Sequence, residues 1–183
     1  MDKKGVIELI LRYLVLILLG LGNLAIFYII FTPLTIYPVY YFLTKLFDPV
    51  FFISTAPIPA IYFKGYVAHI IPACVAGSAY YLLTILNLTA PMKILKRLGS
   101  LAFMFLLFLI LNITRIVVFA NLVPVGYNYF DLTHQLTWYF GSTLMVIIIW
   151  FTNVLIFRIK TIPIYTDIRT IYQEIRKPKE NVI

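Results

Sequence analysis

Blocks of apolar residues, each about as long as a lipid bilayer is thick, constrain this chain more than any other feature. Three blocks are clear, at residues 9–31, 101–122 and 132–157, and a slightly shorter fourth lies at residues 73–90. An α-helix needs roughly 20 apolar residues to cross the hydrocarbon core. The pattern therefore predicts an all-α membrane protein, a polytopic helical bundle with about four core transmembrane helices. No cleavable signal peptide is expected, because the first block is too long and lacks a small-residue cleavage site.

The composition agrees with a chain whose surroundings are mostly lipid. Of the 183 residues, 62% are hydrophobic and 12% are charged, whereas a soluble domain is about half apolar and about a quarter charged. So few charges cannot cover an exterior that faces water. The length allows one compact domain, so residues 1–183 are predicted to form a single membrane domain.

The basic residues predict how the chain is oriented. The formal net charge is +8, but the lysines and arginines fall between apolar blocks rather than along one stripe, so nucleic-acid binding is excluded. With four crossings, three basic clusters lie on one side, which the positive-inside rule makes cytoplasmic. We therefore predict a multi-pass protein of the cell membrane with both termini in the cytoplasm. The clusters are Lys3, Lys4 and Arg12; Lys93, Lys96 and Arg97; and Arg158, Lys160, Arg169, Arg176, Lys177 and Lys179.

The segment at residues 32–72 differs from the apolar blocks, because six prolines and two lysines interrupt it. It is predicted to be an outer segment that caps the helices. Residues 36–47 are too few to cross the membrane and predict a short interfacial helix. Residues 51–71 mix aromatic, β-branched and polar types around a proline pair, which favours a short hairpin or re-entrant flap. The charged tail at residues 159–183 is expected outside the bilayer.

Three polar residues from three predicted helices should meet on the outer side of the membrane. Cys74 opens the second helix, Arg115 lies in the last third of the third, and His134 opens the fourth. A cysteine thiolate is a nucleophile, and a helix start favours its negative charge. Histidine can take the thiol proton and return it to a leaving amine, and arginine can hold an oxyanion. Burying an arginine at this depth costs at least about 2.5 kcal/mol, so its charge should have a partner or a role.

Further polar or small residues share the helix faces of these three. Asn112 lies one turn before Arg115, Ser78 lies four residues after Cys74, and Asp131 lies three residues before His134. Residues three or four apart lie on one helix face, so these side chains are predicted to point toward protein rather than lipid. The same faces carry Gly77, Thr137, Gly141 and Ser142.

Simpler explanations exist for each residue taken alone. A lone cysteine in a membrane helix is usually a small apolar filler, and a lone arginine near a helix end often extends to the interface. His69, five residues before Cys74, is a rival base. Trp138 and Tyr139 fit an interfacial aromatic belt, and the Lys93–Lys96–Arg97 cluster fits the positive-inside signal or an anionic lipid headgroup.

No metal and no cofactor are expected. The single cysteine excludes an internal disulfide and a metal site built from several thiols. The chain has neither a glycine-rich phosphate loop nor a cluster of metal ligands.

The chain resembles the exosortase/archaeosortase family of membrane-embedded cysteine transpeptidases. The resemblance rests on residues 71–78 around Cys74, on residues 112–116 around Arg115, and on His134 with Gly141 seven residues on. It covers about residues 73–157, and the short length favours an archaeosortase. Many members place Ser-Gly or Thr-Gly directly after the cysteine, whereas Val75 and Ala76 intervene here, so the substrate subgroup stays open.

The resemblance implies a sorting reaction at the extracytoplasmic face. The partners would be exported membrane proteins with a C-terminal signal: a recognition motif, a transmembrane helix and a basic cluster. Cys74 would attack the peptide bond outside the membrane, forming a thioester, which a lipid-linked nucleophile would then resolve. Two other hypotheses stay open. One is a non-enzymatic scaffold or transporter subunit, in which Arg115 pairs with Asp131 or a backbone carbonyl. The other is an acyltransferase that uses Cys74 on a lipid.

Overall fold

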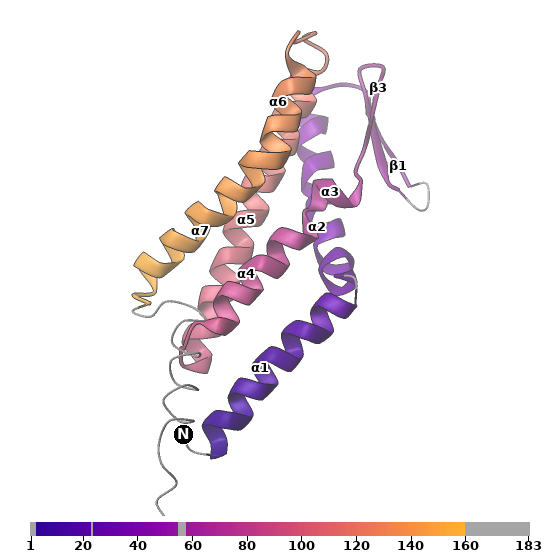
Figure 1. Cartoon of the computed structure of the whole chain (residues 1–183). Helices are drawn as coiled ribbons and strands as arrows, with labels where there is room; N and C mark the ends of the chain where they lie inside the picture. Colours follow the sequence, from indigo (N-terminus) through magenta and orange to yellow (C-terminus); the bar gives the residue numbers. More distant parts are fainter. Residues whose placement is uncertain (1–2, 23, 55–57, 160–183) are drawn as a thin grey trace, which may run out of the picture.

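The computed structural model describes residues 3–22, 24–54 and 58–159, and this part of the chain is mostly helical (Figure 1). The helices are α1 (Lys3–Leu21), α2 (Ala25–Leu46), α3 (Pro72–Val75), α4 (Gly77–Thr89), α5 (Ile94–Leu122), α6 (Phe130–Leu136) and α7 (Ser142–Ile156). A π-helical turn, η1 (Thr137–Gly141), joins α6 to α7. The strands are β1 (Val50–Ile53), β2 (Ala60–Phe63) and β3 (Tyr66–His69).

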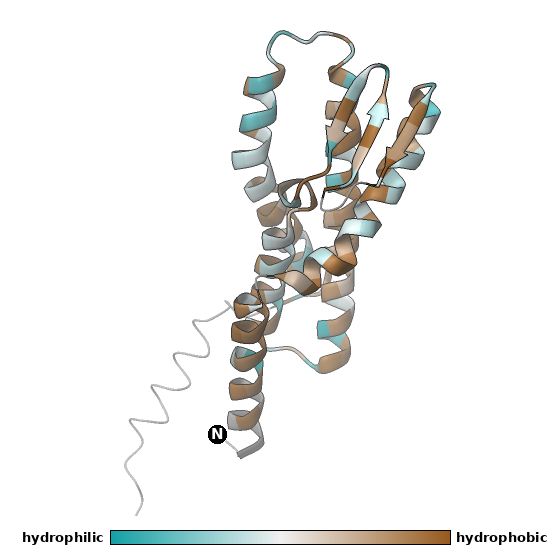
Figure 2. Cartoon of the chain, turned by 90° about the vertical axis from the view of Figure 1, so that its right-hand side faces the viewer, coloured by the Kyte–Doolittle hydropathy of each residue, from teal (hydrophilic) through white to brown (hydrophobic). Residues whose placement is uncertain are grey.

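Three helical segments are long and apolar enough to cross a membrane: Ala25–Leu46, Ile94–Leu122 and Phe130–Ile156. The last two contain most of the apolar blocks at residues 101–122 and 132–157, so helices were predicted correctly there. Figure 2 shows long apolar stretches in the helices, whereas α6, which the loop at the top joins to α5, is partly hydrophilic. The start of α1 and the end of α7 both lie toward the end of the molecule opposite the sheet (Figure 1). Apart from Ile159, the predicted tail at residues 159–183 lies outside the described residues.

The first apolar block does not form one helix, which corrects the prediction for residues 9–31. α1 ends at Leu21, Leu24 has a left-handed backbone with φ 57°, and α2 begins at Ala25. α2 then runs through Pro33 and Pro38 to Leu46, so the separate interfacial helix at residues 36–47 was also wrong. A proline inside a helix usually costs about 3 kcal/mol. Membrane helices tolerate it where neighbouring groups satisfy the freed carbonyl, and α2 is packed against α4 and α5.

The predicted helix at residues 73–90 is divided in two. α3 ends at Val75, Ala76 has a left-handed backbone with φ 58°, and α4 begins at Gly77. α4 has 13 residues, fewer than the roughly 20 that span a hydrocarbon core. Gly77 allows a close approach at this junction, because a Cβ there would lie 2.7 Å from the ring of Tyr28 in α2.

The segment at residues 51–71 forms a three-stranded antiparallel sheet in the order β1–β2–β3, which corrects the all-α expectation. The predicted hairpin is confirmed in β2 and β3, where Phe63 pairs with Tyr66 across a two-residue turn. Both turn residues, Lys64 and Gly65, have positive φ, as the twist of a tight hairpin requires. Ile61 and Phe63 of the central strand are buried against α2 and α5. The sheet is therefore fixed to the helices, and β3 leads directly toward α3.

An aromatic core joins α2, α4 and α5. Tyr80 is fully buried, its ring is stacked on Phe31 with centroids 3.6 Å apart, and Phe105 and Phe108 meet it edge-on. α1 is attached to α4 through the Tyr81 hydroxyl, which donates to a carbonyl of α1 at 2.9 Å.

Arg97 is part of the protein interior, although the sequence predicted it as a member of a water-facing basic cluster. It is 8% exposed, and its guanidinium donates to the carbonyls of Asn87, Leu88 and Ala90 at 2.8–3.0 Å. These carbonyls end α4 and have no partners within the helix. Nearby, a buried chain of hydrogen bonds joins α4, α5 and α7 through the side chains of Asn87, Ser100 and Asn153.

Candidate active site

Cys74 is held in a short turn between the sheet and α4. Pro72 opens this turn, α3, and the Cys74 amide donates to the carbonyl of Ile71 at 2.8 Å. The Asn112 side chain, 1% exposed in α5, donates to the Cys74 carbonyl at 2.8 Å. This hydrogen bond holds the backbone of the turn that carries the thiol against α5. Because α3 has only four residues, it supplies little of the helix dipole that the sequence argument expected at Cys74.

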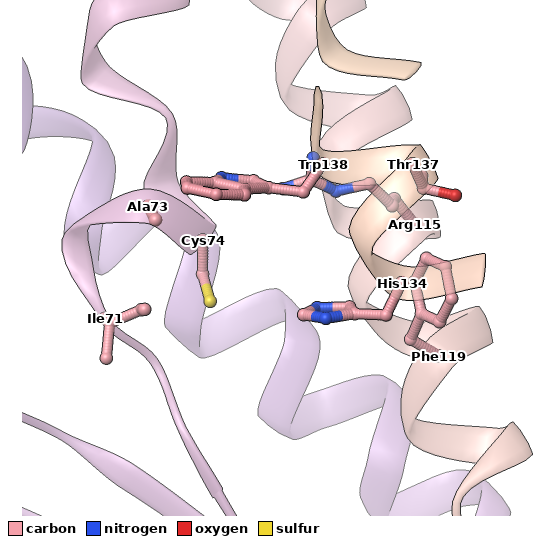
Figure 3. A pocket seen from close by; sticks show the side chains of 8 residues that line it. All are labelled: Ile71, Ala73, Cys74, Arg115, Phe119, His134, Thr137 and Trp138. Atoms are coloured by element: carbon pink, nitrogen blue, oxygen red, sulfur yellow. The ribbon is translucent and has the colours of Figure 1, made fainter. Parts of the chain in front are cut away.

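A cavity of about 240 Å³ brings together the three residues singled out from the sequence (Figure 3). Cys74 reaches it from α3, Arg115 from α5 and His134 from α6. The imidazole of His134 extends across it toward the sulfur of Cys74 (Figure 3). Its lining is completed by Ile71, Ala73, Phe119, Thr137 and Trp138.

Arg115 lines this cavity and is anchored from the opposite helix. Its Nη1 donates to the hydroxyl of Ser142 in α7 at 2.7 Å. The guanidinium and the thiol of Cys74 line the same cavity. Among the described residues, the hydrogen bond of Arg115 goes to Ser142, and neither Asp131 nor a backbone carbonyl, the two partners that the scaffold hypothesis predicted, bonds to it.

Two phenylalanines orient the ring of His134. Phe130, one turn earlier in α6, is parallel to it with centroids 5.7 Å apart, and Phe119 of α5 meets it edge-on at 5.2 Å. Within the described residues no hydrogen bond joins the imidazole to Cys74. The thiol instead donates weakly to the backbone carbonyl of His69, at 4.0 Å. Catalytic hydrogen bonds are often long before substrate binds, so the lack of this bond is compatible with a thiol–imidazole pair.

The other residues considered from the sequence lie outside this cavity. The side chain of His69 is exposed at the end of β3, and only its carbonyl contacts Cys74. Asp131 is exposed in the first turn of α6. Ser78 lines a different cavity, because the backbone at Ala76 breaks the helical spacing that was expected to place it beside Cys74. Of Asn112, Ser78 and Asp131, only Asn112 donates a hydrogen bond to the turn that carries Cys74.

The sequence argument missed the roles of Trp138 and Ser142. Trp138 was assigned to an aromatic belt, but its indole lies over Cys74 and forms one wall of the cavity (Figure 3). Its position four residues after His134 is the signal that places both on one helix face. Ser142 was placed on the His134 face but not recognised as the partner of Arg115.

A thiol, an imidazole and a guanidinium thus line one small cavity with mostly apolar walls. Such a set suits attack on a carbonyl, because the imidazole can accept the thiol proton and the guanidinium can stabilise an oxyanion. No cluster of three or more metal-ligating side chains occurs within the described part of the chain. Comparison of the chain with protein-family models, curated proteins and solved structures found no match.

Proposed function

We propose that this protein is a membrane-embedded cysteine protease and transpeptidase, similar to an archaeosortase, that processes the C-terminal sorting signals of exported surface proteins. The observation that carries the proposal is the convergence of Cys74, Arg115 and His134, from three separate elements, on one cavity. The Arg115–Ser142 hydrogen bond supports it. A half-buried cation that only joined helices would not need to face a thiol.

In the proposed reaction, His134 takes the proton of the Cys74 thiol as the sulfur attacks the substrate carbonyl. A C–S bond forms, and the guanidinium of Arg115 stabilises the negative charge that develops on the carbonyl oxygen. The tetrahedral intermediate collapses with breakage of the C–N bond. The leaving amine receives its proton from His134, and the substrate remains bound to Cys74 as a thioester. The released part is the C-terminal helix of the exported protein that is processed, called the client below.

The proposal places the cavity near the extracytoplasmic face of the cell membrane and both termini in the cytoplasm. This orientation needs a fourth crossing besides the three long helical segments, and the proposal assigns it to α3 together with the 13-residue α4. The distribution of basic residues supports it. A client helix would approach sideways through lipid, so that the peptide bond beyond its outer end meets the cavity. The thioester would then be resolved by a lipid-linked acceptor or by water.

The experiment is processing of a client in membranes. A panel of exported proteins that end in a transmembrane helix and a basic cluster is co-expressed with wild-type protein, Cys74→Ala, His134→Ala or His69→Ala. We expect the first two variants to abolish release of the C-terminal segment and His69→Ala to retain it, because the imidazole of His69 lies outside the cavity. Wild-type processing by Cys74→Ala would reject the proposal and favour the scaffold hypothesis.

A further inference from the structure

A second cavity lies directly beside the thiol cavity. The two share Ala73 and Trp138 as lining residues. The second has a volume of about 450 Å³, compared with about 240 Å³ for the first. Small-molecule sites commonly occupy roughly 300–1,000 Å³, so the second cavity has room for a ligand of its own.

Trp138 lies between elements that border both cavities and lines each of them. Its indole extends from η1 toward α3, over the sulfur of Cys74 (Figure 3). The side chain is 44% exposed, so it is not packed tightly on every side. It belongs to a π-helical turn, a feature that is frequent at functional sites within helices. Because Trp138 lines both cavities, a movement of this one side chain would change both.

The lining of the second cavity is rich in hydroxyl groups and carries no charged side chain among the residues described. Tyr28, Ser78, Tyr139, Ser142 and Thr143 supply the hydroxyls. The Ser142 oxygen accepts a hydrogen bond from Arg115, and a serine hydroxyl that accepts can still donate. Ser142 can therefore contact a ligand in the second cavity while it holds Arg115 in the first. Hydroxyls beside aromatic rings match an uncharged head that itself carries hydroxyls.

The outer wall of the second cavity opens to the apolar exterior of the helices. Its residues Ser78, Tyr139 and Thr143 are exposed. Close to them on α4, η1 and α7, large apolar side chains point outward, including Leu82 (43% exposed), Phe140 (72%) and Leu144 (56%). A ligand with its head in the cavity would therefore leave its tails against an apolar surface. That arrangement fits a membrane lipid better than a soluble molecule.

We infer that the second cavity binds the acceptor of the transfer reaction, as the uncharged, hydroxyl-bearing headgroup of a membrane lipid, and that Trp138 separates it from Cys74 until the thioester has formed. The inference rests on the proposed function. Once Trp138 moves, a hydroxyl of the head attacks the thioester carbonyl. A C–O bond forms and the C–S bond breaks. The hydroxyl proton passes to His134 and then to the sulfur of Cys74, so the product is an ester and the free thiol returns.

The test uses the full-length protein in phosphatidylcholine vesicles with or without a galactosyl diacylglycerol. Thr143→Trp fills the second cavity, and Ile148→Trp, also at an exposed position of α7, is the matched control because Ile148 does not line it. We expect Thr143→Trp to release the client's C-terminal helix as wild type does but to form the ester-linked galactolipid at least about tenfold more slowly. Ile148→Trp should behave as wild type. Added hydroxylamine should still resolve the thioester of Thr143→Trp, which shows that the variant is folded.

Two results would overturn the inference. One is formation of the galactolipid ester by Thr143→Trp at the wild-type rate. The other is resolution of the wild-type thioester at the same rate in vesicles without the galactolipid. A binding measurement separates these results from failure of the proposed function. The chain has two tryptophans, so Trp150→Phe leaves Trp138 as the fluorophore. Its emission should change with galactolipid vesicles but not with phosphatidylcholine vesicles, even if no client is cleaved, and an unchanged emission would reject the cavity as a lipid site.

Discussion

Replacement of Asn112 by leucine removes the hydrogen bond that ties α5 to the turn carrying Cys74. The bond is 2.8 Å long and Asn112 is 1% exposed, so water cannot replace the lost donor. A buried hydrogen bond contributes about 1 kcal/mol net, and leaving its acceptor without a partner costs about 1–3 kcal/mol. The Cys74 carbonyl is the group left without its donor. We therefore expect Asn112→Leu to lower the free energy of unfolding by about 1–3 kcal/mol.

The same substitution should reduce the rate of processing by more than the loss of folded protein explains. A displacement of about 1 Å at a reacting group can cost on the order of a hundredfold in rate, and Asn112 fixes the backbone of the proposed nucleophile. Stability is measured by reversible unfolding in mixed detergent micelles, and processing by release of the client's C-terminal segment per folded enzyme. Asn121→Leu is the control, because Asn121 bonds to its own helix at Val117, at 3.3 Å. Wild-type stability and processing in Asn112→Leu would refute the reasoning.

Three further substitutions test the packing and the site. Gly77→Ala should destabilise the fold by about 1–3 kcal/mol through overpacking, because its new Cβ would lie 2.7 Å from the Tyr28 ring; unchanged thermal unfolding would contradict this contact. Arg97→Gln should lower the midpoint of unfolding and leave the pH dependence of processing unchanged, since Arg97 caps α4 far from the thiol. Ser142→Ala should slow processing roughly tenfold, with cysteine labelling intact, because Arg115 loses a charge-assisted hydrogen bond; a wild-type rate would exclude this positioning role.

The helices predictable from sequence are those whose apolar length is not interrupted. α5 and the α6–η1–α7 segment fulfil that condition, so their type was predicted correctly. The extent of α2 was not predicted, because Pro33 and Pro38 lie inside it. The usual effect of proline on a helix is outweighed here by the packing of α2 on α4 and α5. The break at Ala76 has no sequence signal, since alanine is the strongest helix former. Its left-handed backbone directly precedes Gly77, which lies close to the ring of Tyr28.

The principal site residues could be predicted because polar side chains are costly in apolar helices. Cys74, Arg115 and His134 stand out for that reason, and all three line one cavity. Ser78 was misplaced because helical spacing was extended across the Ala76 break. Trp138 could not be distinguished from an interfacial aromatic, because its amphipathic ring suits both positions. Its place depends on how η1 packs opposite α3, which sequence spacing alone does not give.

The most direct measurement of the central claim is capture of the thioester on Cys74. Wild-type protein is mixed with a cleavable client in vesicles that contain only phosphatidylcholine, quenched with acid, and analysed by intact-mass and peptide mass spectrometry. The account predicts a covalent adduct at Cys74 with the mass of the client's N-terminal part, which hydroxylamine releases and which Cys74→Ala does not form. Cleavage of the client without any adduct at Cys74, or with equal yield in Cys74→Ala, would contradict the account.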